Sequence, residues 1–216
     1  MCAPRAHGAY THASKSATAI AAKIIGALET LEDIPAPEAN NLAAALDEAA
    51  PAIDRAQGEG AAGITRRVTV NPGVVRGGLK VNMVASECTF EVDIRLPNGL
   101  DAPQILAEVD KIVASYPEAS YRQILYNPPS WCPPDTEMAQ LVRANGKEIT
   151  GIDPTPVISL GGTDTRLWRY KDIPAIVYGP SPTGMGSVDE HVTVEEFFHV
   201  VQCHVLSAYD YMSWPG

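Results

Sequence analysis

Metal-binding motifs are the first thing missing from this sequence. The four cysteines, Cys2, Cys88, Cys132 and Cys203, are scattered and form no Cys-x-x-Cys pair. None of the five histidines has an aspartate two residues after it. The cysteine pattern argues against a zinc finger and indicates free thiols in a reducing compartment, so we expect a cytoplasmic protein.

Long apolar runs and an excess of positive charge are also missing. No stretch approaches the roughly 20 apolar residues of a membrane span, and the first residues lack the apolar core of a secretion signal. The formal net charge is −10, which argues against nucleic acids and anionic membranes as partners. With 216 residues, 45% of them hydrophobic, the chain can form one or two domains with cores.

The first part of the chain predicts helices on one face of an antiparallel sheet, an α+β arrangement. Apolar residues recur at helical spacing in residues 14–31, whereas apolar and polar residues alternate in residues 88–96. Pro51 should break or kink the second helix. The predicted strands are 1–6, 65–70, 79–84, 88–96 and 120–126, and the predicted helices are 14–31, 35–56 and one starting at Asp101.

A proline-rich connector at residues 127–134 indicates a domain boundary, because it can continue neither a helix nor a strand. Helices and strands then alternate, which predicts a parallel α/β layer. The last helix should open with a capping box at Thr193 and Glu196. The predicted helices are 135–150, 164–170 and 193–212, and the predicted strands are 155–160 and 175–178.

A glycine pair, Gly161 and Gly162, follows the first of these strands and precedes Thr163 and Asp164. Glycines let a backbone approach a ligand closely, and free N–H groups at the start of a helix attract anions. The motif therefore predicts part of a pocket for an acidic small molecule. Asp164 itself is better explained as a helix cap than as a catalytic residue.

Four motifs together resemble the dinuclear-zinc exopeptidase and deacylase family, which includes acetylornithine deacetylase, succinyl-diaminopimelate desuccinylase and carboxypeptidase G-type enzymes. They are a His-Gly-Ala run at residues 7–9, a Gly-x-x-x-Asn strand at residues 78–82, an Asp-x-Arg strand at residues 93–95, and residues 161–166 together with 188–190. The resemblance implies a lid or dimerisation domain at residues 1–127. It also implies that residues 128–216 are the C-terminal segment of a zinc-peptidase-like α/β domain, and we expect that domain's N-terminal segment to be absent.

The resemblance assigns three lid residues to substrate binding and catalysis. His7 would reach into the partner subunit's active site and stabilise an oxyanion. Asn82 would bind the substrate, and the planar guanidinium of Arg95 would bind its free carboxylate. Each has an alternative that stays open: a surface histidine, a residue of a strand-end turn, and an ion pair of Arg95 with Asp93 or Glu91.

On the catalytic side, the resemblance implies that Gly161, Gly162 and Thr163 line the site and that Arg166 faces an acidic substrate. The family pattern His-x-Val-Asp-Glu has Gly186 in place of its histidine. His191 could compensate as a metal ligand. His199 and Cys203 share a helix face, but core packing explains them better than metal binding.

Two functions therefore stay open, with an unrelated α+β ligand-binding protein as a third possibility. The first is a portion of a metal-dependent amidohydrolase acting on N-acyl amino acids or small peptides with a free carboxylate. The complete enzyme would use zinc, or cobalt or manganese, and whether this chain alone binds one, two or no metals stays open. The second is a non-catalytic dimerisation or partner-binding module. A homodimer through the lid domain is expected in either case.

Overall fold

The computed structural model describes residues 6–37, 42–159 and 161–213, which fall into two compact units. Unit 1 comprises residues 6–37 and 66–129, and unit 2 comprises 42–65 and 130–213 without residue 160. The change of unit at residues 129 and 130 lies inside the proline-rich connector. No helix among the described residues is long and apolar enough to cross a membrane.

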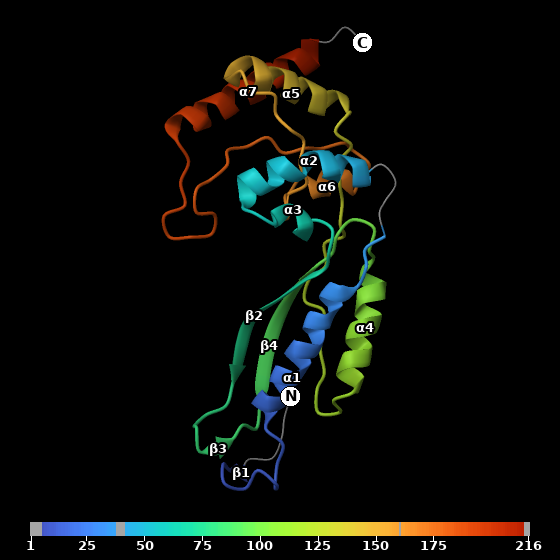
Figure 1. The fold of residues 1–216 in the computed structure, drawn as a ribbon, viewed down its shortest axis with the longest axis vertical. Helices are drawn as coiled ribbons and strands as arrows, with labels where there is room; N and C mark the ends of the chain where they lie inside the picture. Colours follow the sequence, from blue (N-terminus) through green and yellow to red (C-terminus); the bar gives the residue numbers. More distant parts are fainter. Residues whose placement is uncertain (1–5, 38–41, 160, 214–216) are drawn as a thin grey trace. The chain divides into compact units, whose positions relative to one another are not determined.

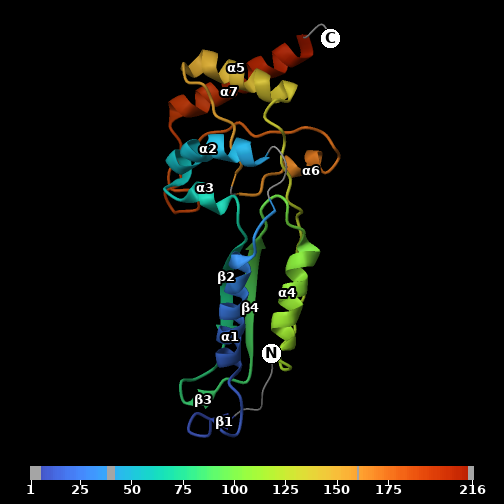
Figure 2. The same ribbon diagram turned by 45° about the vertical axis from the view of Figure 1, so that its right-hand side comes forward.

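The centre of unit 1 is a two-stranded antiparallel sheet of β2 (Thr69–Gly77) and β4 (Cys88–Arg95). Helices α1 (Ala17–Glu29) and α4 (Ala102–Ala114) lie side by side on one face of it (Figures 1 and 2). A register shift between Asn71 and Val74 marks a bulge in β2. The predicted α+β class is confirmed in this unit.

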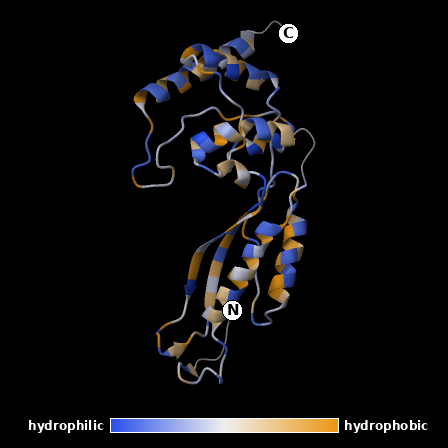
Figure 3. Ribbon diagram, viewed as in Figure 1, coloured by the Kyte–Doolittle hydropathy of each residue, from blue (hydrophilic) through white to orange (hydrophobic). Residues whose placement is uncertain are grey.

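The core of unit 1 forms where the apolar stripes of both helices meet the sheet. Its buried members include Ile20, Ile24 and Leu28 of α1 and Ile105 and Val109 of α4. Alternate residues of β4, Phe90, Val92 and Ile94, pack against this cluster, while their neighbours Glu91 and Asp93 are exposed. Figure 3 shows apolar residues along both the helices and the strands of this unit.

Several predicted boundaries in unit 1 change in the structure. The strand predicted at 65–70 is β2, which begins at Thr69, and that predicted at 79–84 shrinks to β3 (Met83–Val84). β3 pairs with β1 (Ala6–His7); residues 1–5 lie outside the described residues. The strand predicted at 120–126 is wrong. These residues are extended and exposed, and without a buried face nothing fixes their pairing register.

The remaining helical part of the first half is a short 3-10 turn, η1 (Thr30–Asp33), and α2 (Leu42–Gln57), followed by α3 (Ala61–Ile64). The break predicted at Pro51 is wrong, because α2 continues through it. Leu46, Ala49 and Ile53 are buried along one face of α2, and this burial offsets the loss of one backbone hydrogen bond.

Unit 2 also contains α5 (Glu137–Thr150), α6 (Arg166–Arg169) and α7 (Val194–Ser213), and α5 packs against α7. These helices were predicted, although α6 is only one turn long. The strands predicted at 155–160 and 175–178 are wrong for the described residues, which are extended but unpaired. A parallel strand needs a hydrogen-bonded neighbour, and the described residues of unit 2 provide none.

Candidate active-site residues

His7 is held in a small hairpin-like pairing at one end of unit 1. Its backbone pairs with Met83, and the Gly8 N–H donates to the Asn82 carbonyl oxygen at 2.7 Å. A Cβ atom at position 8 would lie 3.0 Å from the Asn82 carbonyl carbon. The glycine after His7 favours this close approach, which places Asn82, in the turn just before β3, beside the end of β1.

The His7 ring is exposed, and its tautomer follows from its surroundings. Nδ1 accepts a hydrogen bond from the Ala9 N–H at 3.2 Å, so a neutral ring carries its proton on Nε2. The Tyr10 ring meets it edge-on, with centroids 6.1 Å apart. His7 thus presents an N–H donor at the end of an oriented ring.

Arg95 does not join this pair. It ends β4, whereas Cys88, the first residue of β4, lies nearest in sequence to Asn82 and β3. Cys88 and Arg95 are seven residue steps apart along β4, which is about 23 Å at the usual rise per residue of a strand. Arg95 Nε donates to Asp93 Oδ2 at 2.8 Å. The ion pair that was the alternative explanation of Arg95 is therefore present.

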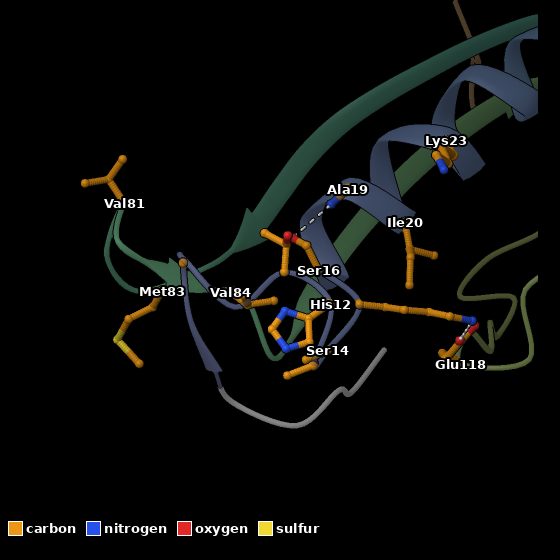
Figure 4. Close-up of a pocket in the computed structure, with 14 residues that line it drawn as sticks. His12, Ser14, Ser16, Ala19, Ile20, Lys23, Val81, Met83, Val84 and Glu118 are labelled. Carbon is orange, nitrogen blue, oxygen red and sulfur yellow. Dashed lines mark hydrogen bonds and ion pairs between the residues drawn. The ribbon is translucent and has the colours of Figure 1, made fainter.

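A hollow opens beside the paired strands β1 and β3 (Figure 4). Its lining combines apolar side chains of α1 and β3, such as Ile20 and Val84, with the polar residues His12 and Lys23. Lys15 Nζ donates to Glu118 Oε1 at 2.6 Å across it. This hydrogen bond lowers the pKa of Glu118. The hollow is lined by neither His7 nor Asn82.

In unit 2, several backbone donors of the segment from Gly161 to Leu167 have partners within the segment or just before it. The Arg166 N–H donates to the Thr163 oxygen at 3.1 Å, the Leu167 N–H to the Asp164 oxygen at 3.0 Å, and the Gly161 N–H to Ser159 Oγ at 3.1 Å. The anion-binding helix start stays a prediction. Gly161 and Gly162 are exposed.

The Arg166 side chain folds back onto this loop. Its Nη1 donates to the Thr163 oxygen at 2.8 Å and to Asp164 Oδ1 at 3.0 Å. Its Nε atom is buried without a hydrogen-bond partner among the described residues. The Asp164 carboxylate is used by Arg166, and its expected role as a helix cap is not seen, since Thr165 occupies the cap position.

His191 closes a loop that begins at Thr183, because the two residues exchange backbone hydrogen bonds of 2.9 and 3.2 Å. Its Nδ1 lies 2.6 Å from the Asp189 carbonyl oxygen, so Nδ1 is the donor and Nε2 carries the free lone pair. Gly186 has φ of 78°, and its N–H donates to Glu190 Oε2 at 2.9 Å. Glu190 therefore holds the loop.

No group of three or more metal-ligating side chains exists among residues 6–37, 42–159 and 161–213. His191 therefore belongs to no such group in that part of the chain. Cys203 is buried, with its Sγ 3.5 Å from the Val142 oxygen, and burial raises the pKa of its thiol. The His199 ring meets Tyr178 edge-on, so both residues pack the helix, as expected.

A buried polar cluster between α5 and α7 was not predicted. Asn145 Nδ2 donates to Ser207 Oγ at 3.2 Å and to Asp210 Oδ2 at 2.9 Å. A Cβ atom at Gly146 would lie 2.9 Å from the Tyr178 hydroxyl oxygen. The Asn-Gly pair inside a helix was the available signal, since both residues are poor helix formers. The cluster joins helices and forms no site.

The comparisons with known proteins fit this arrangement. Residues 4–120, more than half of the chain, match the M20 peptidase dimerisation domain. The chain therefore belongs to this peptidase family, which excludes the unrelated α+β ligand-binding protein. No curated protein matched the chain.

Three solved structures share its fold. A di-peptidase from Saccharomyces cerevisiae is 13% identical with a TM-score of 0.72. The match covers 100% of this chain and 53% of the di-peptidase chain. An M20 family metallo-carboxypeptidase from Sulfolobus solfataricus is 15% identical with a TM-score of 0.71. The match covers 96% of this chain and 55% of the carboxypeptidase chain. A tripeptidase from Staphylococcus aureus is 18% identical with a TM-score of 0.59. The match covers 95% of this chain and 48% of the tripeptidase chain. The chain thus spans about half the length of these structures.

Proposed function

We propose that this chain is the substrate-gripping portion of a metal-dependent amide hydrolase. Residues 1–127 form its lid and dimerisation domain, and residues 128–216 form the C-terminal segment of its catalytic domain. The substrate is an N-acyl amino acid or small peptide with a free carboxylate. The observation that carries the proposal is the pairing of His7 with Met83, next to the hydrogen bond from the Gly8 N–H to the Asn82 carbonyl oxygen, inside the region that matches the peptidase family.

His7 supplies the chemistry of the lid. Amide hydrolysis passes through a tetrahedral intermediate whose oxygen carries negative charge, and a donor placed there stabilises it by about 3 kcal/mol. The Nε2–H of His7 is such a donor, because Ala9 fixes the proton on that nitrogen. Its exposure on unit 1 is what a residue reaching into another subunit's site requires. Asn82, in the turn just before β3, holds the substrate.

Recognition of the carboxylate falls to Arg166, with Gly161, Gly162 and Thr163 beside it. The buried Nε of Arg166 has no acceptor among the described residues, so a movement of the loop that uncovers it would offer a substrate carboxylate a donor. Arg95 is the second candidate, and each arginine would have to leave a neighbouring aspartate, Asp164 or Asp93.

A metal centre does not fit the described residues by themselves. Three protein ligands are the usual minimum for a catalytic zinc. His191 could supply one of them, through the free lone pair of its Nε2. We propose that zinc, or cobalt or manganese, is held by ligands outside these residues, and we derive no step through it. The scattered cysteines, three of them free thiols, support a cytoplasmic location.

The experiment compares residues 1–216 with the longest reading frame that contains them. Zinc content and hydrolysis of N-acyl amino acids are measured for both, with His7→Gln and the matched control His12→Gln. We expect His7→Gln to lower kcat/KM of the active form about 100-fold and His12→Gln to leave it nearly unchanged. Stoichiometric zinc and hydrolysis from residues 1–216 alone would contradict the proposal.

The second candidate function is a non-catalytic module that binds a complementary polypeptide, and one surface favours it. An apolar stripe runs along α7 at spacings of four and three residues, on the side opposite the buried Val200, Cys203 and Ser207. Its exposed members are Val194, Phe198, Val201, Val205, Tyr209 and Met212. Exposed stripes of this length mark interaction surfaces. No hydrolysis from either form, with a bound partner lost on Val201→Glu, would select this function.

A further inference from the structure

Arg169, the last residue of α6, joins three segments of unit 2. Its Nη1 donates to Thr165 Oγ1 and to the Ala175 carbonyl oxygen, both at 2.9 Å. Its Nε donates to Ser130 Oγ at 3.0 Å. Ser130 lies in the proline-rich connector, and Ala175 lies in the segment that follows α6. The half-buried guanidinium therefore fixes the start of α6 against two segments distant from it in the chain.

Each of these three acceptors is neutral. Arg143 of α5, in contrast, donates its Nε to the carboxylate of Asp153 at 2.7 Å, which is an ordinary ion pair. The acceptors of Arg169 are two hydroxyls and a carbonyl, and they use the rigid arrangement of the guanidinium donors rather than its charge. Arg169 therefore orients its neighbours, and its positive charge stays beside the loop that leads into α6.

The Thr165 hydroxyl connects Arg169 to Thr163. Thr165 Oγ1 lies 2.6 Å from Thr163 Oγ1, and either oxygen can be the donor at this distance. Because Thr165 already accepts from Arg169, its own hydrogen is available, and hydrogen bonds that run in one direction strengthen each other. In that direction Thr165 donates to Thr163, which leaves the hydroxyl hydrogen of Thr163 for another acceptor.

Thr163 in turn holds both the backbone and the side chain of Arg166. The Thr163 carbonyl oxygen accepts from the Arg166 N–H at 3.1 Å and from Arg166 Nη1 at 2.8 Å. Thr163 is half-buried, whereas Gly161 and Gly162 before it are exposed. A shift of Thr163 would therefore displace the Arg166 guanidinium together with the Thr163 hydroxyl.

We infer that Arg169 is a positioning residue for recognition of the substrate carboxylate, and that it acts through Thr165 on Thr163 and Arg166. The inference rests on the proposed function, in which Thr163 and Arg166 line the substrate site. Arg169 directs the Thr163 hydroxyl hydrogen toward the carboxylate and keeps Arg166 in place. Because the carboxylate takes no part in the bond that is cleaved, this contact is equally strong in the ground state and the transition state.

Steady-state kinetics of the longest reading frame that contains residues 1–216 test the inference with Thr165→Val, which removes the hydroxyl and keeps the side-chain shape. The substrates are an N-acetyl amino acid and the same compound with its carboxylate converted to an amide. We expect KM for the free carboxylate to rise about tenfold with little change in kcat, and the kinetics with the amide to stay as in the wild type. Thr165→Ser, which keeps the hydroxyl, should retain the wild-type KM. Arg169→Gln should act like Thr165→Val, and the double variant should be no worse than either single variant, because both act through the same hydrogen bonds.

The matched control is Arg143→Gln, which removes another arginine of unit 2, one that is paired with Asp153, and should change neither KM nor kcat. A variant that only destabilised the fold would lower kcat for both substrates and leave KM unchanged. That pattern for Thr165→Val and Arg169→Gln, an equal change with both substrates, or no change overturns the inference and leaves the proposed function standing. A wild type that hydrolyses neither substrate overturns the proposed function and the inference with it.

Discussion

Unit 1 and unit 2 both contain helices with apolar faces but differ in what covers those faces. In unit 1 the apolar faces of α1 and α4 meet the sheet of β2 and β4 in one continuous core. In unit 2 the face of α7 opposite α5 remains exposed. Its extended segments at 155–159 and 175–178 have no sheet neighbour among the described residues. Among the described residues, unit 1 therefore buries the apolar faces of its helices against a sheet, whereas unit 2 leaves one face of α7 uncovered.

Shortening one fully buried isoleucine in each unit is the strongest test of the difference between the units. Ile24 lies in the large cluster of unit 1 and Ile53 in a small one with Ala49 and Ala61. We expect Ile24→Ala to lower the free energy of unfolding by about 2–5 kcal/mol, and Ile53→Ala by less, because a loose site collapses around the cavity. Urea unfolding followed by hydrogen exchange in each unit measures both, and equal losses would contradict the comparison.

The polar cluster of unit 2 gives the next effect. Asn145→Ala removes the donor to Ser207 and Asp210, and buried groups left unpaired cost about 1–3 kcal/mol. Ser207→Ala, which removes one hydrogen bond and keeps the other, is the control and should cost less. Urea unfolding of α5 and α7 distinguishes the variants. If Asn145→Ala left the free energy of unfolding unchanged, apolar packing alone would hold these helices together.

Among the described residues, each unit contains one buried cysteine, and the reactivities of these two thiols test the difference between the units. Burial raises the pKa of both the Cys88 and Cys203 thiols, so each is protonated and unreactive in the closed state. In a Cys2→Ser background we expect a thiol reagent to modify Cys132 first, then Cys203, then Cys88, because unit 2 opens more readily. Mass spectrometry of a labelling time course gives the order, and Cys88 reacting before Cys203 would reverse the ranking of the units.

The smallest effect concerns one exposed ion pair in each unit. The hydrogen bond from Lys15 lowers the pKa of Glu118, and that from Arg143 lowers the pKa of Asp153. Each carboxylate therefore stabilises the fold above its ordinary pKa, and this contribution is lost as the pH falls through the lowered pKa. Glu118→Gln and Asp153→Asn should each slightly reduce the drop in Tm between neutral and acidic pH. Tm values that fall as steeply as in the wild type would show that the pair contributes nothing.

Local signals in the sequence were sufficient for the helices. Ser16 accepts a hydrogen bond from the Ala19 N–H at the start of α1, and Thr193 accepts one from the Glu196 N–H at the start of α7. The second half of the Thr193 capping box is replaced, because Glu196 instead accepts from the Ser181 N–H at 2.7 Å. A side chain's local partner can be predicted from spacing, but a competing distant partner cannot.

The candidate site was predictable only in part. The His-Gly pair at residues 7 and 8 and the Gly-x-x-x-Asn motif were visible in the sequence, and the structure pairs His7 with Met83, next to Asn82 in the preceding turn. The sequence placed Arg95 with them through the family resemblance, although β4 carries it to the far end of the strand. Motif order along a chain does not give distance, which depends on strand direction.

The sequence by itself determined the helix faces, the alternation in β4 and the absence of a metal-binding motif, because spacing and residue type are local properties. Only the tertiary structure decided which segments become strands and which face of α7 lacks a neighbour. These outcomes depend on hydrogen bonds and burial between residues far apart in the chain.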